Sequence, residues 1–235
     1  MDNNDLTTAV DAVIRSRKSI RAFLAKSVDH QLILDILNIA ARAPSGSNVQ
    51  PWKVYVIEGD VKVRLSKAIK AVFNDPAQSS QYRPEYIYYP KTWVEPFLSR
   101  RRKVGFDLYH LVGIARGESQ KMHDQHAKNF DFFGAPVALV LTIPRMMELG
   151  SWLDYGMFIQ NILLAAQARG LHTCPQAALI QYHQIVAQHV GYSADEQMVC
   201  TISLGYEDSS APENQIETER VDAEEFATFV NDYSL

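Results

Sequence analysis

Residues 43–52 read APSGSNVQPW, and the segment KVYVIEG follows at 53–59. The small residues Ser45, Gly46 and Ser47 allow the backbone to approach a ligand closely, and the amides of Asn48 and Gln50 both donate and accept hydrogen bonds. The β-branched and aromatic residues after the loop, ended by a glycine, predict a buried strand. Taken alone, the loop is equally typical of an ordinary helix-to-strand connection. Its interpretation depends on the segments around it.

A dense cationic segment precedes this loop. RSRKSIRAF, at 15–23, places three arginines, a lysine and two serines in seven positions of a chain with a formal net charge of −4. Guanidinium groups bind phosphate through paired charge-assisted hydrogen bonds, so Arg17, Lys18, Ser19 and Arg21 form a candidate anion site. Cations that complement the end of a preceding helix are the simpler alternative. A pI near 6.0 argues against a general nucleic-acid binder, and the short apolar runs argue against a membrane anchor.

The hydrophobic periodicity predicts a globular α/β chain with a single domain over 1–235. Asp29 is a predicted N-cap, and the helix over 152–169 is apolar on nearly all sides, as expected for a core or a subunit interface. The predicted helices span 5–16, 30–42, 60–73, 97–117 and 152–169, and the predicted strands span 53–59, 136–144 and 198–206.

A second unusual region covers about 75–117. Four prolines stand among six aromatic residues between 76 and 97, so regular structure is not expected before the helix that begins near 97. Connections of this length are often functional lids. Arg100, Arg101, Arg102 and Lys103 fit a solvated first helical turn, or the attraction of a nucleotide phosphate or acidic substrate. The tail 207–235 is expected to wrap over a surface as a C-terminal extension.

Other residues carry weaker signals. The polar start predicts no export signal, and two cysteines form neither a disulfide framework nor a metal-ligand pattern, which favours a cytoplasmic protein. His123 and His126 lack the partners of a metal site, so no metal is predicted. Asp195 and Glu196 are expected to flank a turn before a strand, and Cys174 is expected to be a small buried residue.

The order of these motifs resembles the nitroreductase family of flavoenzymes over nearly the whole chain. The R-x-S-x-R pattern at 17–21, the PSxxNxQPW loop at 44–52 and NFDFFGAPVALVLT at 129–142 carry the resemblance. It continues through GSWLDYGMFIQNILLAAQARGL, CPQAAL, ISLGYED and the terminal ETERV at 217–221. The segment SRRRKVGFDLYHLVGIARG at 99–117 looks most like the nitrobenzoate-reductase-like branch.

The resemblance implies an α+β fold, a three-layer α/β/α sandwich with a central and mostly antiparallel sheet. It also implies an intertwined homodimer that binds FMN at the subunit interface and is reduced by NADH or NADPH. Arg17, Lys18 and Ser19 would bind the FMN phosphate together with Arg220, although Glu217 stands where many relatives have a basic residue. The remaining implied cofactor residues are Pro44, Ser45, Ser47 and Asn48 from the other subunit, and Pro175, Gln176, Ala177 and Ala178 beside the flavin ring.

Arg21 is the implied catalytic residue. A cation near flavin N1 and O2 stabilises the negative charge of the reduced form, and the cofactor itself performs hydride transfer. The expected acceptor is a small planar nitroaromatic or quinone, held between the flavin and aromatic residues from 82–110 together with Phe132 and Phe133. A carboxylated nitroarene suits the branch resemblance. Alternatives are reductive dehalogenation, enone reduction, flavin fragmentation, or a flavin-binding or redox-sensing protein without turnover.

Overall fold

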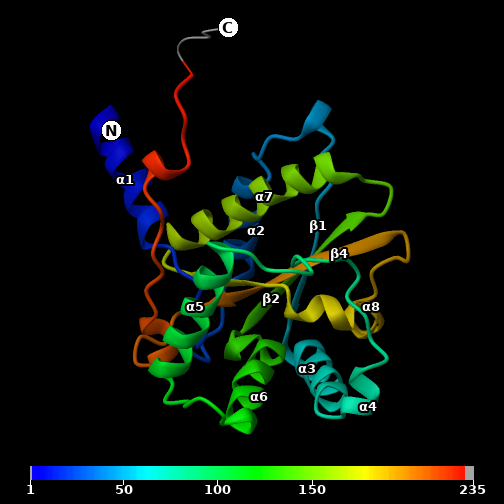
Figure 1. Cartoon of the computed structure of the whole chain (residues 1–235). Coiled ribbons are helices and arrows are strands. Elements are labelled where there is room, and N and C mark those ends of the chain that lie inside the picture. Colours follow the sequence, from blue (N-terminus) through cyan, green and yellow to red (C-terminus); the bar gives the residue numbers. More distant parts are fainter. Residues whose placement is uncertain (1, 231–235) are drawn as a thin grey trace, which may run out of the picture.

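The computed structural model describes residues 2–230, so the last part of the predicted tail lies outside the described residues. A four-stranded sheet lies at the centre, with the order β1, β2, β4, β3 (Figure 1). All neighbouring strands are antiparallel. The strands span Lys53–Glu58 (β1), Val137–Pro144 (β2), His172–Gln176 (β3) and Glu196–Gly205 (β4).

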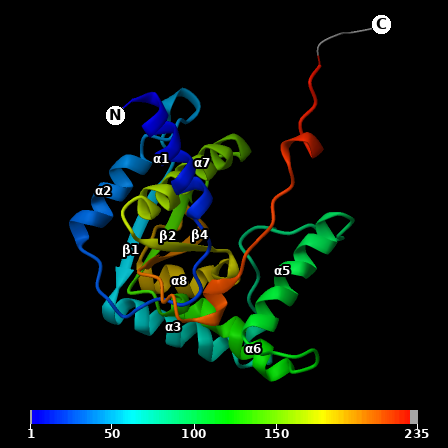
Figure 2. The same ribbon diagram turned by 90° about the vertical axis from the view of Figure 1, so that its left-hand side faces the viewer.

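The central strand β2 buries both of its faces. Val137, Leu139 and Leu141 pack against helices α2 (His30–Ala40) and α7 (Leu149–Gln167). Ala138 and Val140 face the opposite side, where α3 (Gly59–Phe73) and α8 (His183–Val190) cover the sheet. Side chains alternate between the faces of a strand, so a continuously apolar strand needs a helical layer on each side. Figures 1 and 2 show these three layers, and the predicted fold class is confirmed.

The other helices surround this core. They are α1 (Asn3–Ser16), α4 (Pro76–Ser79), α5 (Phe97–Leu111) and α6 (Ser119–Ala127). Short 3₁₀ turns occur at Gly46–Asn48, Lys128–Gly134, Ala178–Tyr182, Pro212–Gln215 and Ala223–Glu225. The side chain of Asp29 accepts hydrogen bonds from the amides of Gln31 and Leu32, so the predicted N-cap of α2 is confirmed. No helix within residues 2–230 is both long enough and apolar enough to cross a bilayer.

Two sequence predictions of secondary structure are wrong. The helix that begins at Phe97 ends at Leu111 rather than at Gly117, because Gly113 adopts a left-handed conformation with φ of +68°. Strand β3 was not predicted, since it has five residues and contains Pro175. Proline lacks a backbone N–H and is tolerated there because β3 is an edge strand.

The C-terminal segment is partly buried up to residue 216 and mostly exposed after it, over 217–230. Asn214 and Ile216 are buried against the body, whereas residues 217–230 are mostly exposed. Figure 2 shows this segment and α5 projecting from the rest of the chain. Within a single chain, Phe226 and Phe229 are 71% and 88% exposed, so the surface that the tail is expected to cover is not supplied by its own chain at these residues.

Glu196 is a structural carboxylate rather than a residue flanking a turn, because β4 begins there and its side chain is buried. It accepts hydrogen bonds from the Tyr55 hydroxyl at 3.0 Å, from Lys53 Nζ at 2.9 Å and from Thr142. Burial alone would raise the pKa of Glu196, but these hydrogen bonds outweigh it and hold the pKa below its ordinary value. The ionised carboxylate thus joins β1, β2 and β4.

We expect Glu196→Ala to lower the free energy of unfolding by about 2–3 kcal/mol, because the buried Thr142 hydroxyl loses its acceptor. A folded-state pKa below the unfolded one gives stability that is present above about pH 4.5 and is lost as the pH falls through the folded value. Urea unfolding between pH 3 and 7 measures both the lower free energy of unfolding of the variant and the loss of stability at acid pH. Glu196→Gln should show a smaller acid-induced loss than the wild type, and an equal loss in both proteins would contradict this assignment.

Candidate active site

One cavity of about 560 Å³ collects most of the residues predicted to lie beside the flavin ring. Arg21 contributes from the turn after α1, and the end of β3 with the turn that follows it contributes residues 175–178. Segment 84–89 supplies three tyrosines on the remaining side. The predicted cofactor residues in this lining are Arg21, Pro175, Gln176, Ala177 and Ala178, and the predicted aromatic residues are Tyr86, Tyr88, Tyr89 and Phe133. Asn129 is a lining residue that was not predicted.

The sheet edge brings Arg21 to this cavity. Ser19 forms an isolated parallel bridge with Thr173, and the Ile20 amide donates to the Thr173 carbonyl at 3.0 Å. The segment after α1 therefore extends the sheet beside β3. Ile20 is completely buried and fixes the segment, which leaves Arg21 at the cavity wall.

A buried asparagine holds the same segment from its other side. The Arg21 amide donates to Asn214 Oδ1 at 2.7 Å, and Asn214 Nδ2 donates to the carbonyls of Ala22 at 2.8 Å and Asp208 at 2.9 Å. Asn214 is fully buried. Sequence reasoning missed this residue because nothing local distinguishes it from other polar residues of the tail.

The cations predicted to bind phosphate lie in two further cavities that share residues of the tail. Arg17, Lys18 and Arg220 line a cavity of about 680 Å³, and Ser19 and Arg220 line one of about 310 Å³. Burial and the positive charge of Arg220 lower the pKa of Arg17. An anion between these guanidinium groups would relieve their repulsion. Glu217 lines both cavities, so the acidic residue noted in the sequence does lie beside the cations.

Lys18 differs from Arg17 in its partners. Its Nζ donates to the Asn214 carbonyl at 2.7 Å and pairs with Glu207 Oε1 at 3.0 Å. Arg17 makes no side-chain hydrogen bond or ion pair within residues 2–230. The structure therefore leaves Arg17 more available to an anion than Lys18.

The polar loop that follows α2, at 43–52, lies apart from these cavities. Pro44, Ser45, Ser47 and Asn48 line none of the cavities described above, and most of the loop is exposed. The Gly46 amide donates to Asp154 Oδ2 of α7 at 3.0 Å. Ser47 and Asn48 adopt left-handed conformations with φ of +50° and +57°, which is uncommon outside glycine. An exposed and conformationally costly loop is typical of a binding surface.

Two residues fix the aromatic segment to the sheet. Glu85 accepts from the Met198 amide at 2.8 Å and forms an ion pair with Arg145. The Tyr86 hydroxyl donates to the Val199 carbonyl at 2.6 Å, and its ring meets Trp152 edge to face at 4.8 Å. Residues 85 and 86 are thus anchored on β4. Ile87, Tyr88 and Tyr89 follow with exposed side chains at the cavity, and the predicted position of the lid aromatics beside the ring cavity is consistent with this arrangement.

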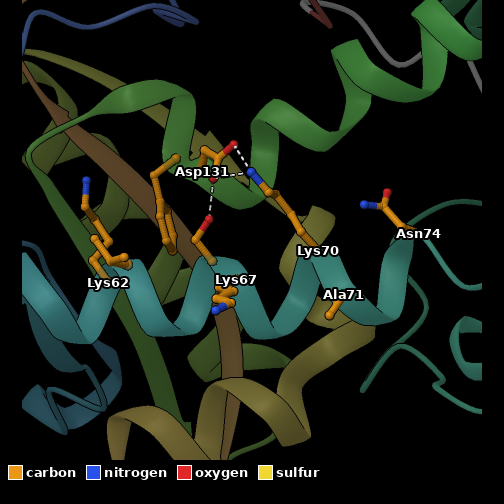
Figure 3. Close-up of a pocket in the computed structure, with 9 residues that line it drawn as sticks. Lys62, Lys67, Lys70, Ala71, Asn74 and Asp131 are labelled. Atoms are coloured by element: carbon orange, nitrogen blue, oxygen red, sulfur yellow. Dashed lines mark hydrogen bonds and ion pairs between the residues drawn. The ribbon is translucent and has the colours of Figure 1, made fainter.

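A strained turn presents Phe133 to the cavity. Phe132 and Phe133 both have left-handed φ values, +54° and +55°, which is costly for bulky residues. Asp131 lies just before them and accepts from Lys70 Nζ of α3 at 2.7 Å (Figure 3). It also accepts from the Ser66 hydroxyl. Phe132 is buried in the core, so of the two predicted phenylalanines Phe133 alone lines the cavity of Arg21. The separate cavity of about 440 Å³ in Figure 3 contains none of the predicted flavin residues.

We expect Asp131→Ala to lower the free energy of unfolding by about 1–2 kcal/mol, since the Ser66 hydroxyl loses an acceptor and the ion pair is partly solvated. Without the contacts of Asp131 to α3, the turn at 132–133 should shift. Phe133 should then move and change the visible circular dichroism of bound flavin. Lys67→Ala is the matched control, because Lys67 lines the cavity of Figure 3 and forms no ion pair within residues 2–230. Identical flavin spectra for Asp131→Ala and Lys67→Ala would contradict the role of Asp131.

The sulfur and imidazole groups near the cavity fit structural roles. Cys174 is buried as predicted, and burial raises the pKa of its thiol to about 11, so the thiol is neutral at pH 7. The ring of His123 stacks on Phe73 at 4.2 Å, and its Nε2 forms a hydrogen bond of 2.9 Å with Asn74. Such contacts account for His123 without a metal ion.

Comparisons with known proteins agree with the motif order. A sequence model of the nitroreductase family matches residues 14–206. The chain belongs to the nitroreductase family. This nitroreductase is 37% identical to nitrobenzene nitroreductase from Ectopseudomonas oleovorans, over 95% of this chain and 97% of that protein. It is 36% identical to 4-nitrobenzoate reductase from Pseudomonas putida, over 96% and 97% of the two chains.

A solved structure gives the same result. The FMN- and NADPH-dependent nitroreductase NfnB from a Sphigopyxis strain superposes with a TM-score of 0.90 and 33% identity, covering 95% of this chain and 99% of that one. The chain is thus an NAD(P)H-dependent nitroreductase that uses FMN as its cofactor.

The residues present fit FMN. A cluster of mutually repelling guanidinium groups suits a phosphate, and the adjacent cavity between Arg21 and the 175–178 backbone suits a flat ring. Pro175 has no backbone N–H, so among 175–178 a backbone donor to the ring would come from 176–178.

Proposed function

We propose that both half-reactions, oxidation of NAD(P)H and reduction of a planar nitroaromatic acceptor, occur in the cavity of Arg21. The observation that carries this proposal is the convergence of Arg21, the 175–178 backbone and three tyrosines on one space of about 560 Å³. A single space of this size requires donor and acceptor to bind in turn, which gives ping-pong kinetics. When bound, FMN accepts a hydride from the donor and passes two electrons to the acceptor.

The chain's own residues position and stabilise these groups. Arg17, Ser19 and Arg220 bind the phosphate, with Lys18 contributing less because Glu207 pairs with it. Arg21 places a positive charge at the end of the cavity where negative charge increases during reduction. Tyr88, Tyr89 and Phe133 give the acceptor an apolar and aromatic wall that excludes water.

The acceptor class follows from the relatives and the cavity together. Nitrobenzene and 4-nitrobenzoate reductases are among the similar proteins, and the aromatic wall suits a small nitroarene. Steady-state oxidation of NADPH with nitrobenzene, 4-nitrobenzoate, menadione and oxygen tests this. Parallel lines in double-reciprocal plots with a nitroarene support the proposal. Turnover with an enone or halogenated phenol but not with a nitroarene would favour the alternative chemistries, and reduction of bound FMN by NADPH without any turnover would favour a sensor.

We also propose that the protein is a cytoplasmic homodimer. Helix α1 has no buried residue, and its stripe of Leu6, Val10 and Ile14 is about half exposed. Leu149 and Leu153 of α7 are exposed as well, at 84% and 72%. Apolar stripes of this size are typical of subunit interfaces. A second copy would cover them and bring the loop at 44–48 to a flavin of the first copy.

Light scattering after size exclusion tests the assembly. We expect a mass near twice 26.6 kDa for the wild type. Val10→Asp should weaken association and release FMN, whereas Thr8→Asp, on the exposed opposite face of the same helix, should leave both unchanged. A monomer that binds FMN fully would contradict the proposed dimer without affecting the family assignment.

A further inference from the structure

A cavity of about 640 Å³ lies between α5, the connection at 114–117 and the start of α6, and it is separate from the cavity of Arg21. Its polar lining includes Arg101, Arg102 and Arg116, and its apolar lining includes Phe106 and Tyr109. Among residues 2–230, no aspartate or glutamate lines it. In a chain with a net charge of −4, this is a local concentration of positive charge beside aromatic rings.

The three arginines have no acidic partner within residues 2–230, and their side chains make no hydrogen bond there. The acidic groups of α5 and α6 have other partners, and Asp124 accepts from the Gln120 side chain at 2.8 Å. Asp107 binds Lys103 at 2.8 Å, and Glu118 binds Lys121 at 2.6 Å. Guanidinium groups without partners around an aromatic hollow match a ligand that combines a planar ring with phosphate groups.

A helical glycine opens the hollow. Gly105 lines the cavity in the middle of α5, and a Cβ placed on it meets no atom within 4 Å. Glycine inside a helix costs about 1 kcal/mol relative to alanine, and no close packing requires it here. The missing side chain therefore keeps space at the cavity wall instead of serving helix stability.

The hollow adjoins the cavity of Arg21. The Arg101 guanidinium lies 5.8 Å from the ring centre of Tyr89 and 5.0 Å from that of Trp93, and Tyr89 lines the cavity of Arg21. On α6, Met122 lines the hollow and His126 lines the cavity of Arg21, one helical turn apart. A ligand with two aromatic ends and phosphates between them can reach both spaces.

We propose that this hollow binds the adenosine-phosphate end of the nicotinamide dinucleotide, with Arg102 and Arg116 on its phosphates and Phe106 or Tyr109 against the adenine. The nicotinamide end then lies in the cavity of Arg21. The proposal rests on NAD(P)H being the electron donor and assigns a site to the part of the donor that does not react. Remote contacts of this kind set donor affinity and orientation without taking part in hydride transfer.

Direct binding of adenosine 2′,5′-bisphosphate to the FMN-loaded protein tests the proposal by calorimetry. We expect binding that competes with NADPH, and a Kd about 10-fold higher in Arg102→Ala or Arg116→Ala, since each variant removes charged hydrogen bonds. Arg64→Ala is the control, because Arg64 is an exposed arginine of α3 that lines none of these cavities. Kinetically, the KM for NADPH should rise in parallel while kcat stays within about 2-fold.

Gly105→Leu provides a second variant that does not remove charge. Leucine favours the helix more than glycine, so the melting temperature should not fall, yet the side chain fills the hollow and should abolish binding of the bisphosphate. Equal affinity of the bisphosphate for the wild type, Arg102→Ala and Gly105→Leu would overturn the proposal. A rise in the KM for 4-nitrobenzoate with no change for NADPH would also overturn it, by assigning the hollow to the acceptor. In either case intact NADPH-driven nitroreduction would leave the proposed function standing.

Discussion

Arg21→Ala should slow the reduction of bound FMN by NADPH about 100-fold or more, the usual effect of removing a group that stabilises charge as it develops in a reaction. The Arg21 side chain lines the cavity, donates to the Ser19 carbonyl at 3.2 Å and has no ion-pair partner within residues 2–230. No neighbouring acid neutralises it. Its charge is therefore available to the cofactor, and no other arginine lines that cavity.

Stopped-flow absorbance at saturating NADPH measures this step apart from donor binding. Arg21→Lys keeps a charge but loses the planar fork, so an intermediate rate is expected. The backbone of residue 21 is held by Asn214 and by the sheet edge, which lets the side chain be removed without displacing the segment. Wild-type reduction rates in Arg21→Ala with FMN fully bound would remove Arg21 from this role.

The second large effect is expected for cofactor affinity. Arg17→Ala should raise the Kd of FMN about 10- to 100-fold, because each charge-assisted hydrogen bond to a phosphate contributes about 1.5–3 kcal/mol. Lys18→Ala should have a smaller effect, because Lys18 is already paired with Glu207 and the Asn214 carbonyl. The Kd of FMN for each variant is measured by the recovery of FMN fluorescence on dilution and by titration of the apoprotein with FMN.

Arg220 provides the internal check. Arg17 and Arg220 line the same cavity, and burial together with the charge of Arg220 lowers the pKa of Arg17. Arg220→Ala and the double variant should therefore show a coupling energy in a double-mutant cycle. Additive effects, or a larger loss for Lys18→Ala than for Arg17→Ala, would contradict the assignment of the phosphate to Arg17 and Arg220. Glu217→Gln should strengthen FMN binding slightly, because Glu217 lines the same cavities.

The amino-acid sequence by itself determined the family, the central elements and the cationic turn. Strands β1, β2 and β4 were predicted to within two residues at each end, because continuous apolar runs have few alternatives to a covered sheet. Periodicity predicted the helices α2 and α3 to within two residues at each end and α7 to within three. Arg21 and 175–178 were named from motif order, and the structure places them around one cavity.

Tertiary structure alone decided what depends on contacts between distant segments. Strand β3 exists because β4 provides its partner, although its own residues, with Pro175 among them, do not favour a strand. Asn214 belongs to the site because the tail packs against the turn after α1. It is 193 positions from Arg21 in the sequence, yet it accepts a hydrogen bond from the Arg21 amide. Glu196 became a buried ionised group because three donors from other strands meet it. Local sequence fixes backbone preferences and apolar faces, whereas the partners of a polar side chain are set by which segments the folded core brings together.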